Sequence, residues 1–95
     1  MNASYELEGQ NTLIKSREVL LSGGKQTSSA SDVWSLGVML YALGCGFLPF
    51  KTIGAILDEP LSWSAYETAG IKASVSFKSL ITEMLHKNAK HRPTV

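Results

Sequence analysis

Cysteine is almost absent from this chain of 95 residues, in which Cys45 is the single one. A lone thiol excludes an internal disulfide, and no second ligand stands near it at the spacing of a metal site. His86 and His91 lie in a polar, basic stretch without an acid or cysteine at ligand spacing, so we expect surface histidines. The sequence therefore predicts no bound metal, and it favours a reducing, intracellular and cytoplasmic location.

The chain also lacks an excess of charge of either sign. Nine basic residues against eight acidic ones give a formal net charge of +1, and neither sign forms a run. Such a chain has no field to attract nucleic acid or an anionic membrane surface, so both are excluded as partners. The first ten residues lack the basic and then apolar pattern of a signal peptide. Residues 1–12 are polar without periodicity, so we expect a flexible arm ahead of one small unit at residues 13–95.

One long apolar stretch, Ala30–Phe50, dominates the rest of the chain. Between Asp32 and Lys51 lie eighteen residues without a charge, and no helical face of this stretch is polar. A helix that is apolar all round must be buried on every side, either inside a domain or in lipid. We therefore expect this helix to be the centre of the fold.

The residues at the two ends of this stretch show whether the helix is long enough to span a lipid bilayer or is buried inside a protein domain. Ser31 or Asp32 can cap the first turn, and the glycines and proline of G-C-G-F-L-P end the helix near Leu43 or Gly44. A helix of about 13 residues is about 20 Å long, whereas the core of a bilayer is about 30 Å thick. The helix is thus predicted to lie inside a soluble domain.

Three further segments carry helical signals. Residues 13–21 favour a short helix or turn, Ile53–Leu57 has an apolar stripe behind a cap at Thr52, and Phe77–Leu85 has one behind a cap at Ser76. Residues 61–75 lack a period and are expected to be mostly loop, with one helical turn. The predicted fold class is all-α, with one buried central helix and two or three shorter helices.

Two motifs in this helical framework match a known family. The pattern S-D-V-W-S-L-G-V-x-L-Y-x-L-x-x-G-x-x-P-F at residues 31–50 resembles the central helix and following loop of the C-terminal lobe of eukaryotic protein kinases. The run M-L-x-x-N-x-x-x-R-P-T at residues 84–94 resembles the last motif of that lobe, with Ala89 where the family has proline. The short sequences W-S-L-G and G-F-L-P-F resemble those of Ser/Thr kinases. The resemblance therefore implies a C-terminal-lobe fragment of a Ser/Thr protein kinase, truncated and kinase-like over residues 13–95.

The resemblance gives six residues structural rather than chemical roles: Glu18, Asp32, Trp34, Gly37, Pro49 and Arg92. Glu18 ends the triplet Ser16-Arg17-Glu18, thirteen residues before Ser31, where the family has Ala-Pro-Glu. In the family this glutamate forms a buried ion pair with the arginine of the final motif. Glu18 and Arg92 are therefore expected to meet, and the alternative is two solvated surface charges.

The groups that phosphoryl transfer requires are missing from these 95 residues. Kinases need a glycine-rich loop over the phosphates, a lysine on a strand, a catalytic aspartate, and an aspartate and an asparagine for magnesium. The chain has no G-x-G-x-x-G, His-Arg-Asp or Asp-Phe-Gly, and Gly24-Lys25 lacks phosphate-loop spacing. Gln10 and Asn11 also replace the family's Gly-Thr pair, so the substrate-docking loop departs from the family. No catalytic, ATP-binding or metal-binding residue is predicted, although ATP and Mg²⁺ serve the parent family.

Three functions stay open. The first is an inactive kinase fragment, the second a non-catalytic interaction module that competes for a kinase's partners, and the third a part of an active kinase completed by other sequence. Only two amphipathic helices are available to cover the central helix, so we expect an exposed apolar patch to which a protein partner can bind. His-Arg-Asp and Asp-Phe-Gly upstream would select the third function. A stable monomer with a specific partner would select the second.

Overall fold

The computed structural model describes residues 13–24 and 28–94, so the expected arm at residues 1–12, with Gln10 and Asn11, and the Lys25 position lie outside the described residues. The helices are α2 (Arg17–Leu21), α3 (Ser29–Cys45), α4 (Ile53–Asp58), α5 (Ser64–Ala69), α6 (Val75–Met84) and the short 3-10 helix η1 (Ala89–His91). Neither described range contains a strand, which confirms the all-α prediction.

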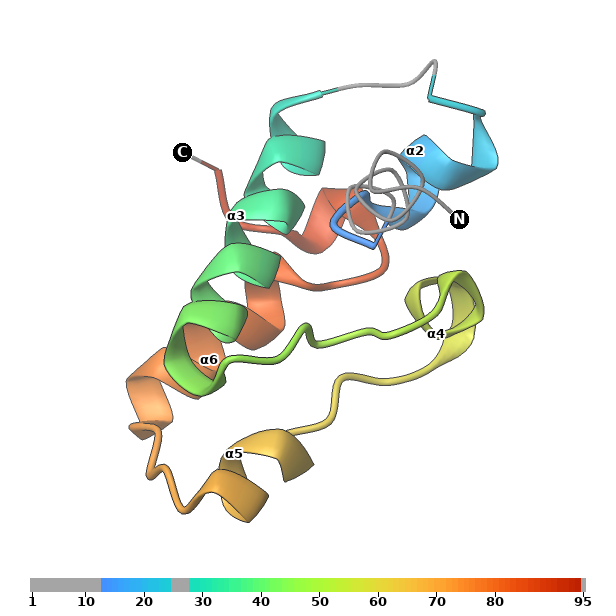
Figure 1. Ribbon diagram of the computed structural model, residues 1–95. Coiled ribbons are helices and arrows are strands. Elements are labelled where there is room, and N and C mark those ends of the chain that lie inside the picture. Colours follow the sequence, from blue (N-terminus) through green and yellow to red (C-terminus); the bar gives the residue numbers. More distant parts are fainter. Residues whose placement is uncertain (1–12, 25–27, 95) are drawn as a thin grey trace.

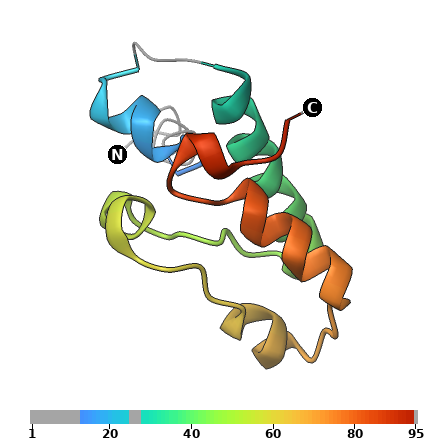
Figure 2. The same cartoon turned by 180° about the vertical axis from the view of Figure 1, so that it is seen from behind.

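Helix α3 is the centre of the fold, as predicted. Figures 1 and 2 show α6 running along one side of α3, with α5 beside the C-terminal end of α3. Helix η1 contacts α3 as well, and α2 and α4 lie to one side. Segments from the beginning and the end of the described chain therefore meet beside the first half of α3.

Both ends of α3 lie outside the predicted limits. Ser28 rather than Ser31 or Asp32 is the N-cap, because the backbone N–H of Ser31 donates to Ser28 Oγ at 3.2 Å. At the other end Gly46 adopts a left-handed φ of 83°, which a glycine accepts without steric cost, and its N–H donates to the carbonyl of Ala42. The 17 residues of α3 correspond to about 25 Å. No helix within the described ranges is long and apolar enough to cross a membrane.

One face of α3 is buried and the other is not. Trp34, Val38 and Tyr41 are almost completely buried in the main apolar cluster, whereas Leu43 is 81% exposed. Leu36 and Met39 are also exposed on this side. The expectation that α3 is buried on every side was wrong, because α6 and α5 cover only part of its circumference. The expectation that too few helices are available to cover it agrees with this exposed face.

A glycine allows α6 to approach α3 closely. A Cβ atom placed on Gly37 would lie 2.9 Å from Cβ of Met84 and 3.1 Å from Cδ2 of Leu85. Both of these residues are buried against α3. Helix α6 begins two residues earlier than predicted, because Ser74 rather than Ser76 accepts a hydrogen bond from the N–H of Phe77. The predicted cap of α4 at Thr52 is confirmed by its bond from the N–H of Ala55 at 3.0 Å.

Helix α5 (6 residues) is longer than the single helical turn expected within residues 61–75. It adds a fourth shorter α-helix to the described residues, and it has no side-chain cap at its beginning. Tyr66 anchors it: the ring is buried, lies 5.0 Å from the Tyr41 ring between centroids, and its hydroxyl donates to the Tyr41 carbonyl at 2.7 Å. Gly44 leaves room for this hydroxyl, because a Cβ there would collide with it. Packing on α3, rather than local periodicity, stabilises α5.

Candidate functional site

Glu18 and Arg92 form a bidentate ion pair. Nη1 of Arg92 donates to Oε2 of Glu18 at 2.7 Å, and Nη2 donates to Oε1 at 2.9 Å, although the two residues are 74 positions apart. The Arg92 side chain is fully buried and the Glu18 side chain is 22% exposed. The alternative of two solvated surface charges is therefore wrong. Two parallel charge-assisted bonds fix both the distance and the orientation of the pair.

Every N–H of the Arg92 guanidinium has an acceptor. Besides the two bonds to Glu18, Nε donates to the carbonyl of His86 at 2.8 Å, Nη1 to that of Ala30 at 3.1 Å, and Nη2 to that of Lys87 at 3.3 Å. A guanidinium has five donors. The cation is thus completely satisfied where it is buried, and it ties α2, the first turn of α3 and the 86–87 segment together.

The carboxylate of Glu18 is correspondingly stabilised in its charged form. Burial by itself would raise the pKa of Glu18, but hydrogen bonds from Arg92, from its own backbone and from Ser31, together with the Arg92 charge, lower the pKa to about 2. The Ser31 hydroxyl donates to Oε2 of Glu18 at 3.0 Å. Sequence reasoning gave Ser31 only a capping role. No sequence signal points to its contact with Glu18, because that contact depends on the fold.

The Trp34 ring lies close to two cations, Arg92 and Lys87. The Arg92 guanidinium is 5.0 Å from the Trp34 ring centroid, and the ring stacks on Phe50 with centroids 5.5 Å apart. Nζ of Lys87 lies 3.9 Å from the Phe50 centroid and donates to the carbonyl of Ala55 at 3.1 Å. No sequence signal points to the position of Lys87 near the Trp34 and Phe50 rings, because that contact depends on the fold. These contacts give Trp34 a packing and cation–π role.

The remaining positions singled out by the resemblance are separate from the ion pair. Gly37 is the point of closest approach between α3 and α6. Asp32 is exposed in the first turn of α3, where a carboxylate complements the helix dipole. Pro49 lies in the loop after α3. The structure thus brings Glu18, Arg92 and Trp34 together, whereas Asp32, Gly37 and Pro49 serve different parts of α3 and its loop.

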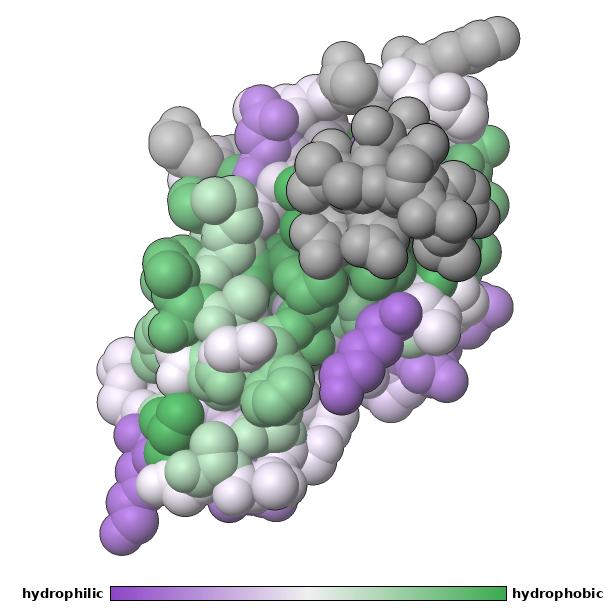
Figure 3. Space-filling model, viewed as in Figure 1, coloured by the Kyte–Doolittle hydropathy of each residue, from purple (hydrophilic) through white to green (hydrophobic). Residues whose placement is uncertain are grey.

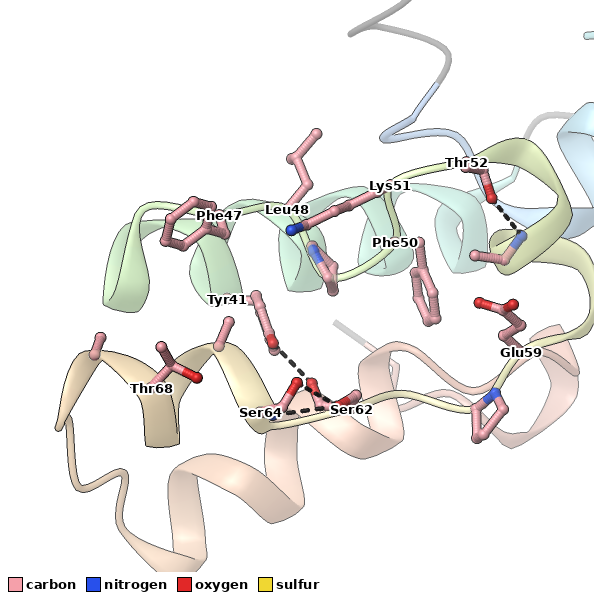
Figure 4. A pocket seen from close by; sticks show the side chains of 15 residues that line it. Tyr41, Phe47, Leu48, Phe50, Lys51, Thr52, Glu59, Ser62, Ser64 and Thr68 are labelled. Atoms are coloured by element: carbon pink, nitrogen blue, oxygen red, sulfur yellow. Dashed lines mark hydrogen bonds between the residues drawn. The ribbon is translucent and has the colours of Figure 1, made fainter.

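A hollow of about 570 Å³ opens between the loop after α3 and the helices α4 and α5. Figure 4 shows Phe50 between Tyr41 and Glu59, with Lys51 above the rings. The Tyr41 hydroxyl is already used, since it donates to the Ser62 carbonyl at 2.7 Å. Burial, followed by the neighbouring Cys45 and Tyr66, raises the pKa of Tyr41 to about 12. This tyrosine is therefore a structural donor and not an acid or base near neutral pH.

The exposed face of α3 is visible as an apolar area on the surface in Figure 3. Leu36, Met39 and Leu43 recur at helical spacing on this face and are each at least 45% exposed. Phe47, in the loop that follows, is exposed as well. Within the part of the chain that the structure describes, no group of three or more metal-ligating side chains occurs.

Comparison with known sequences agrees with the geometry. The family described as protein kinase domain matches residues 14–95. The maternal embryonic leucine zipper kinase of Xenopus tropicalis is 52% identical over 77 residues, covering 80% of this chain and 12% of the relative. The human SNF-related serine/threonine-protein kinase is 32% identical over 84 residues, covering 88% of this chain and 11% of the relative. The chain thus spans only about a tenth of the length of these relatives. It belongs to the protein kinase domain family, with serine/threonine-protein kinases among its relatives.

Proposed function

We propose that residues 13–95 are a helical portion of the C-terminal lobe of a Ser/Thr protein kinase and that the 95-residue chain does not transfer phosphate by itself. The observation that carries this proposal is the bidentate pair between Glu18 and Arg92. It joins the kinase-like triplet at residues 16–18 to the final kinase-like motif at residues 84–94. Its donors and acceptors are saturated by protein groups, so its role is architectural.

The chemistry of the side chains supports an inactive chain. The 95 residues lack a glycine-rich loop, a His-Arg-Asp and an Asp-Phe-Gly. Those elements position ATP, Mg²⁺ and the hydroxyl that receives the phosphate. A whole kinase containing this segment would bring them from other sequence, use ATP and Mg²⁺, and phosphorylate protein Ser or Thr. Such a protein would act inside the cell, where ATP is available.

Titration of ATP with Mg²⁺ into purified residues 1–95, followed by calorimetry, tests the proposal. We expect no binding heat above that of dilution and no label transfer from γ-labelled ATP to a generic Ser/Thr substrate. The matched control joins the same residues to sequence carrying the glycine-rich loop, His-Arg-Asp and Asp-Phe-Gly. A dissociation constant in the micromolar range for residues 1–95 alone would contradict the proposal.

A second candidate function is a non-catalytic interaction module. The uncovered α3 residues favour it, because contiguous exposed apolar side chains mark surfaces where proteins associate. Under this proposal the chain would compete with a kinase for a protein partner. Substitution of Leu36 and Met39 by glutamine would then abolish binding of that partner, while the matched substitution of exposed Leu21 and Val75 on other helices would leave it intact.

A further inference from the structure

A second hollow, of about 630 Å³, lies beside Glu18, between α2 and the segment that runs from Lys87 into η1. Three cations line it, and they come from both ends of the described chain: Arg17, Lys87 and Lys90. The single acid among the lining residues is Glu18, whose two oxygens are occupied by Arg92 and Ser31. The hollow therefore carries a positive charge that its own lining does not neutralise.

Each of the three cations keeps donors that form no hydrogen bond within residues 13–24 and 28–94. Arg17 donates through Nε to the carbonyl of Leu57 at 3.1 Å, which leaves both terminal NH₂ groups of its guanidinium. Lys87 gives one of its three N–H groups to the carbonyl of Ala55, and its Nζ also lies 3.9 Å from the Phe50 centroid, which leaves it fewer donors for the hollow than Arg17. Across residues 13–24 and 28–94, the ion pair of Glu18 with Arg92 is the only one closer than 4 Å, so none of the three cations has a carboxylate partner there.

Backbone carbonyls of α4 hold two of these like charges together. Both the Leu57 and the Ala55 carbonyls belong to α4, and they accept from Arg17 and Lys87 respectively. Burial, and next the nearby charge of Arg17, lower the pKa of Lys87, while Asp58 and Glu59 act in the opposite direction. The two cations thus lie close enough to interact, and an anion in the hollow would be attracted by both.

Asn88 adds a neutral donor to the same hollow. Its side-chain oxygen accepts from the N–H of Lys90 at 3.0 Å, and this leaves the amide NH₂ without a partner in the part of the chain that the structure describes. Cationic forks and ammonium groups beside neutral N–H donors are the chemistry that binds tetrahedral phosphate oxygens.

From this arrangement we propose that Arg17, Lys87, Lys90 and Asn88 form a binding site for a phosphate dianion, either as free phosphate or on a phosphorylated side chain. Glu18 lies at one border of the site, and its pair with Arg92 fixes α2 relative to residue 87. The anion would bind as a ligand only, since no group for its transfer lies in the hollow.

Amide NMR spectra of residues 1–95 during titration with inorganic phosphate test the site. We expect saturable shifts confined to residues 17–22 and 87–90, and no such shifts when chloride is added to the same ionic strength. Lys90→Gln is the first variant, because the Lys90 side chain is exposed and forms no hydrogen bond or ion pair with another described residue, so its loss should leave the fold intact. It should weaken phosphate binding about 3- to 10-fold, as should Arg17→Gln. Lys51→Gln removes the same charge from the other hollow and should have no effect.

A short neutral peptide with one phosphoserine, compared with its unphosphorylated form, distinguishes the two sources of phosphate. Tighter binding of the phosphopeptide than of inorganic phosphate would assign the site to a phosphorylated chain, and equal binding would assign it to free phosphate. Shifts spread over all lysines, equal shifts with chloride, or equal weakening by Lys51→Gln and Lys90→Gln would each overturn the proposal. These outcomes do not depend on whether the chain binds ATP.

Discussion

Arg92 donates hydrogen bonds to both carboxylate oxygens of Glu18, at 2.7 and 2.9 Å, although the two residues are 74 positions apart in the sequence. Removal of the cation by Arg92→Ala leaves the Glu18 carboxylate partly buried without its partner. A buried pair that loses one member costs about 3 to 5 kcal/mol of unfolding free energy. We expect that loss in urea unfolding followed by circular dichroism.

Arg92→Lys is the informative companion variant. Lysine keeps the charge but has three donors instead of five, and it lacks the planar fork that meets both oxygens. We expect it to recover less than half of the stability that Arg92→Ala loses. Recovery close to the wild-type value would mean that the charge alone matters and that the five-bond geometry does not.

Acid should weaken the fold through Glu18. The pKa of this carboxyl is lowered from 4.5 to about 2, so its stabilisation is complete above pH 4.5 and is lost as the pH falls toward 2. Over that window the loss amounts to about 3 kcal/mol. Unfolding midpoints in urea between pH 6 and pH 2 measure it. In Glu18→Gln this component should be absent, and an unchanged acid dependence in that variant would exclude Glu18 as its source.

Gly37→Ala tests the close contact of α3 with α6. Alanine is the better helix former, but its Cβ would lie 2.9 Å from Cβ of Met84, which is attached to the α6 backbone and cannot turn away. Overpacking of this kind costs about 1 to 3 kcal/mol. Gly54→Ala in α4 is the matched control, since its Cβ would meet only the Thr52 hydroxyl at 3.9 Å. Thermal unfolding should show a lower midpoint for Gly37→Ala and an equal or higher one for Gly54→Ala.

Ser16→Ala should stabilise the chain. The Ser16 hydroxyl is buried without a hydrogen-bond partner among the described residues, and its side chain is almost fully enclosed. An unsatisfied buried polar group costs about 1 to 3 kcal/mol, so its removal should raise the unfolding free energy by about 1 kcal/mol. Ser79→Ala, at an exposed position of α6, provides the control. A less stable Ser16→Ala chain would reveal a partner for the hydroxyl.

The parts of the fold that sequence predicted are those with local signals. The long uncharged stretch around Trp34 predicted α3, and the Thr52 cap predicted α4, because apolar periodicity and capping depend only on neighbouring residues. The meeting of Glu18 with Arg92 came from the family resemblance, since no spacing rule connects residues 74 positions apart. The apolar and capping patterns thus predicted helices, and the family resemblance predicted one long-range contact.

The parts that sequence missed depend on packing. Packing of the Tyr66 ring against Tyr41 holds helix α5 in place, and no local apolar periodicity predicts its full length. The N-caps at Ser28 and Ser74 were displaced because several serines stand near each helix start, and any of them can accept the first hydrogen bond. The contact of Lys87 with the Phe50 ring could not be predicted, because the two residues are distant in sequence.

This kinase segment leaves part of α3 uncovered. Dye binding during thermal unfolding tests that exposure most directly. Burial of one large apolar side chain contributes about 1.5 to 3 kcal/mol, so three uncovered α3 residues remove much of a total of about 5 to 15 kcal/mol. Residues 1–95 should therefore bind an apolar dye in the native state and unfold over a broad range, as monitored by near-UV circular dichroism.

Two variants show where on the protein the dye binds. Replacement of Leu36, Met39 and Leu43 by glutamine should remove most of the dye binding, whereas replacement of the exposed Leu21, Val75 and Leu80 should retain most of it. The contradictory result would be a sharp cooperative transition above about 60 °C with no dye bound to the native monomer. That outcome would mean that α3 is fully covered in the isolated chain.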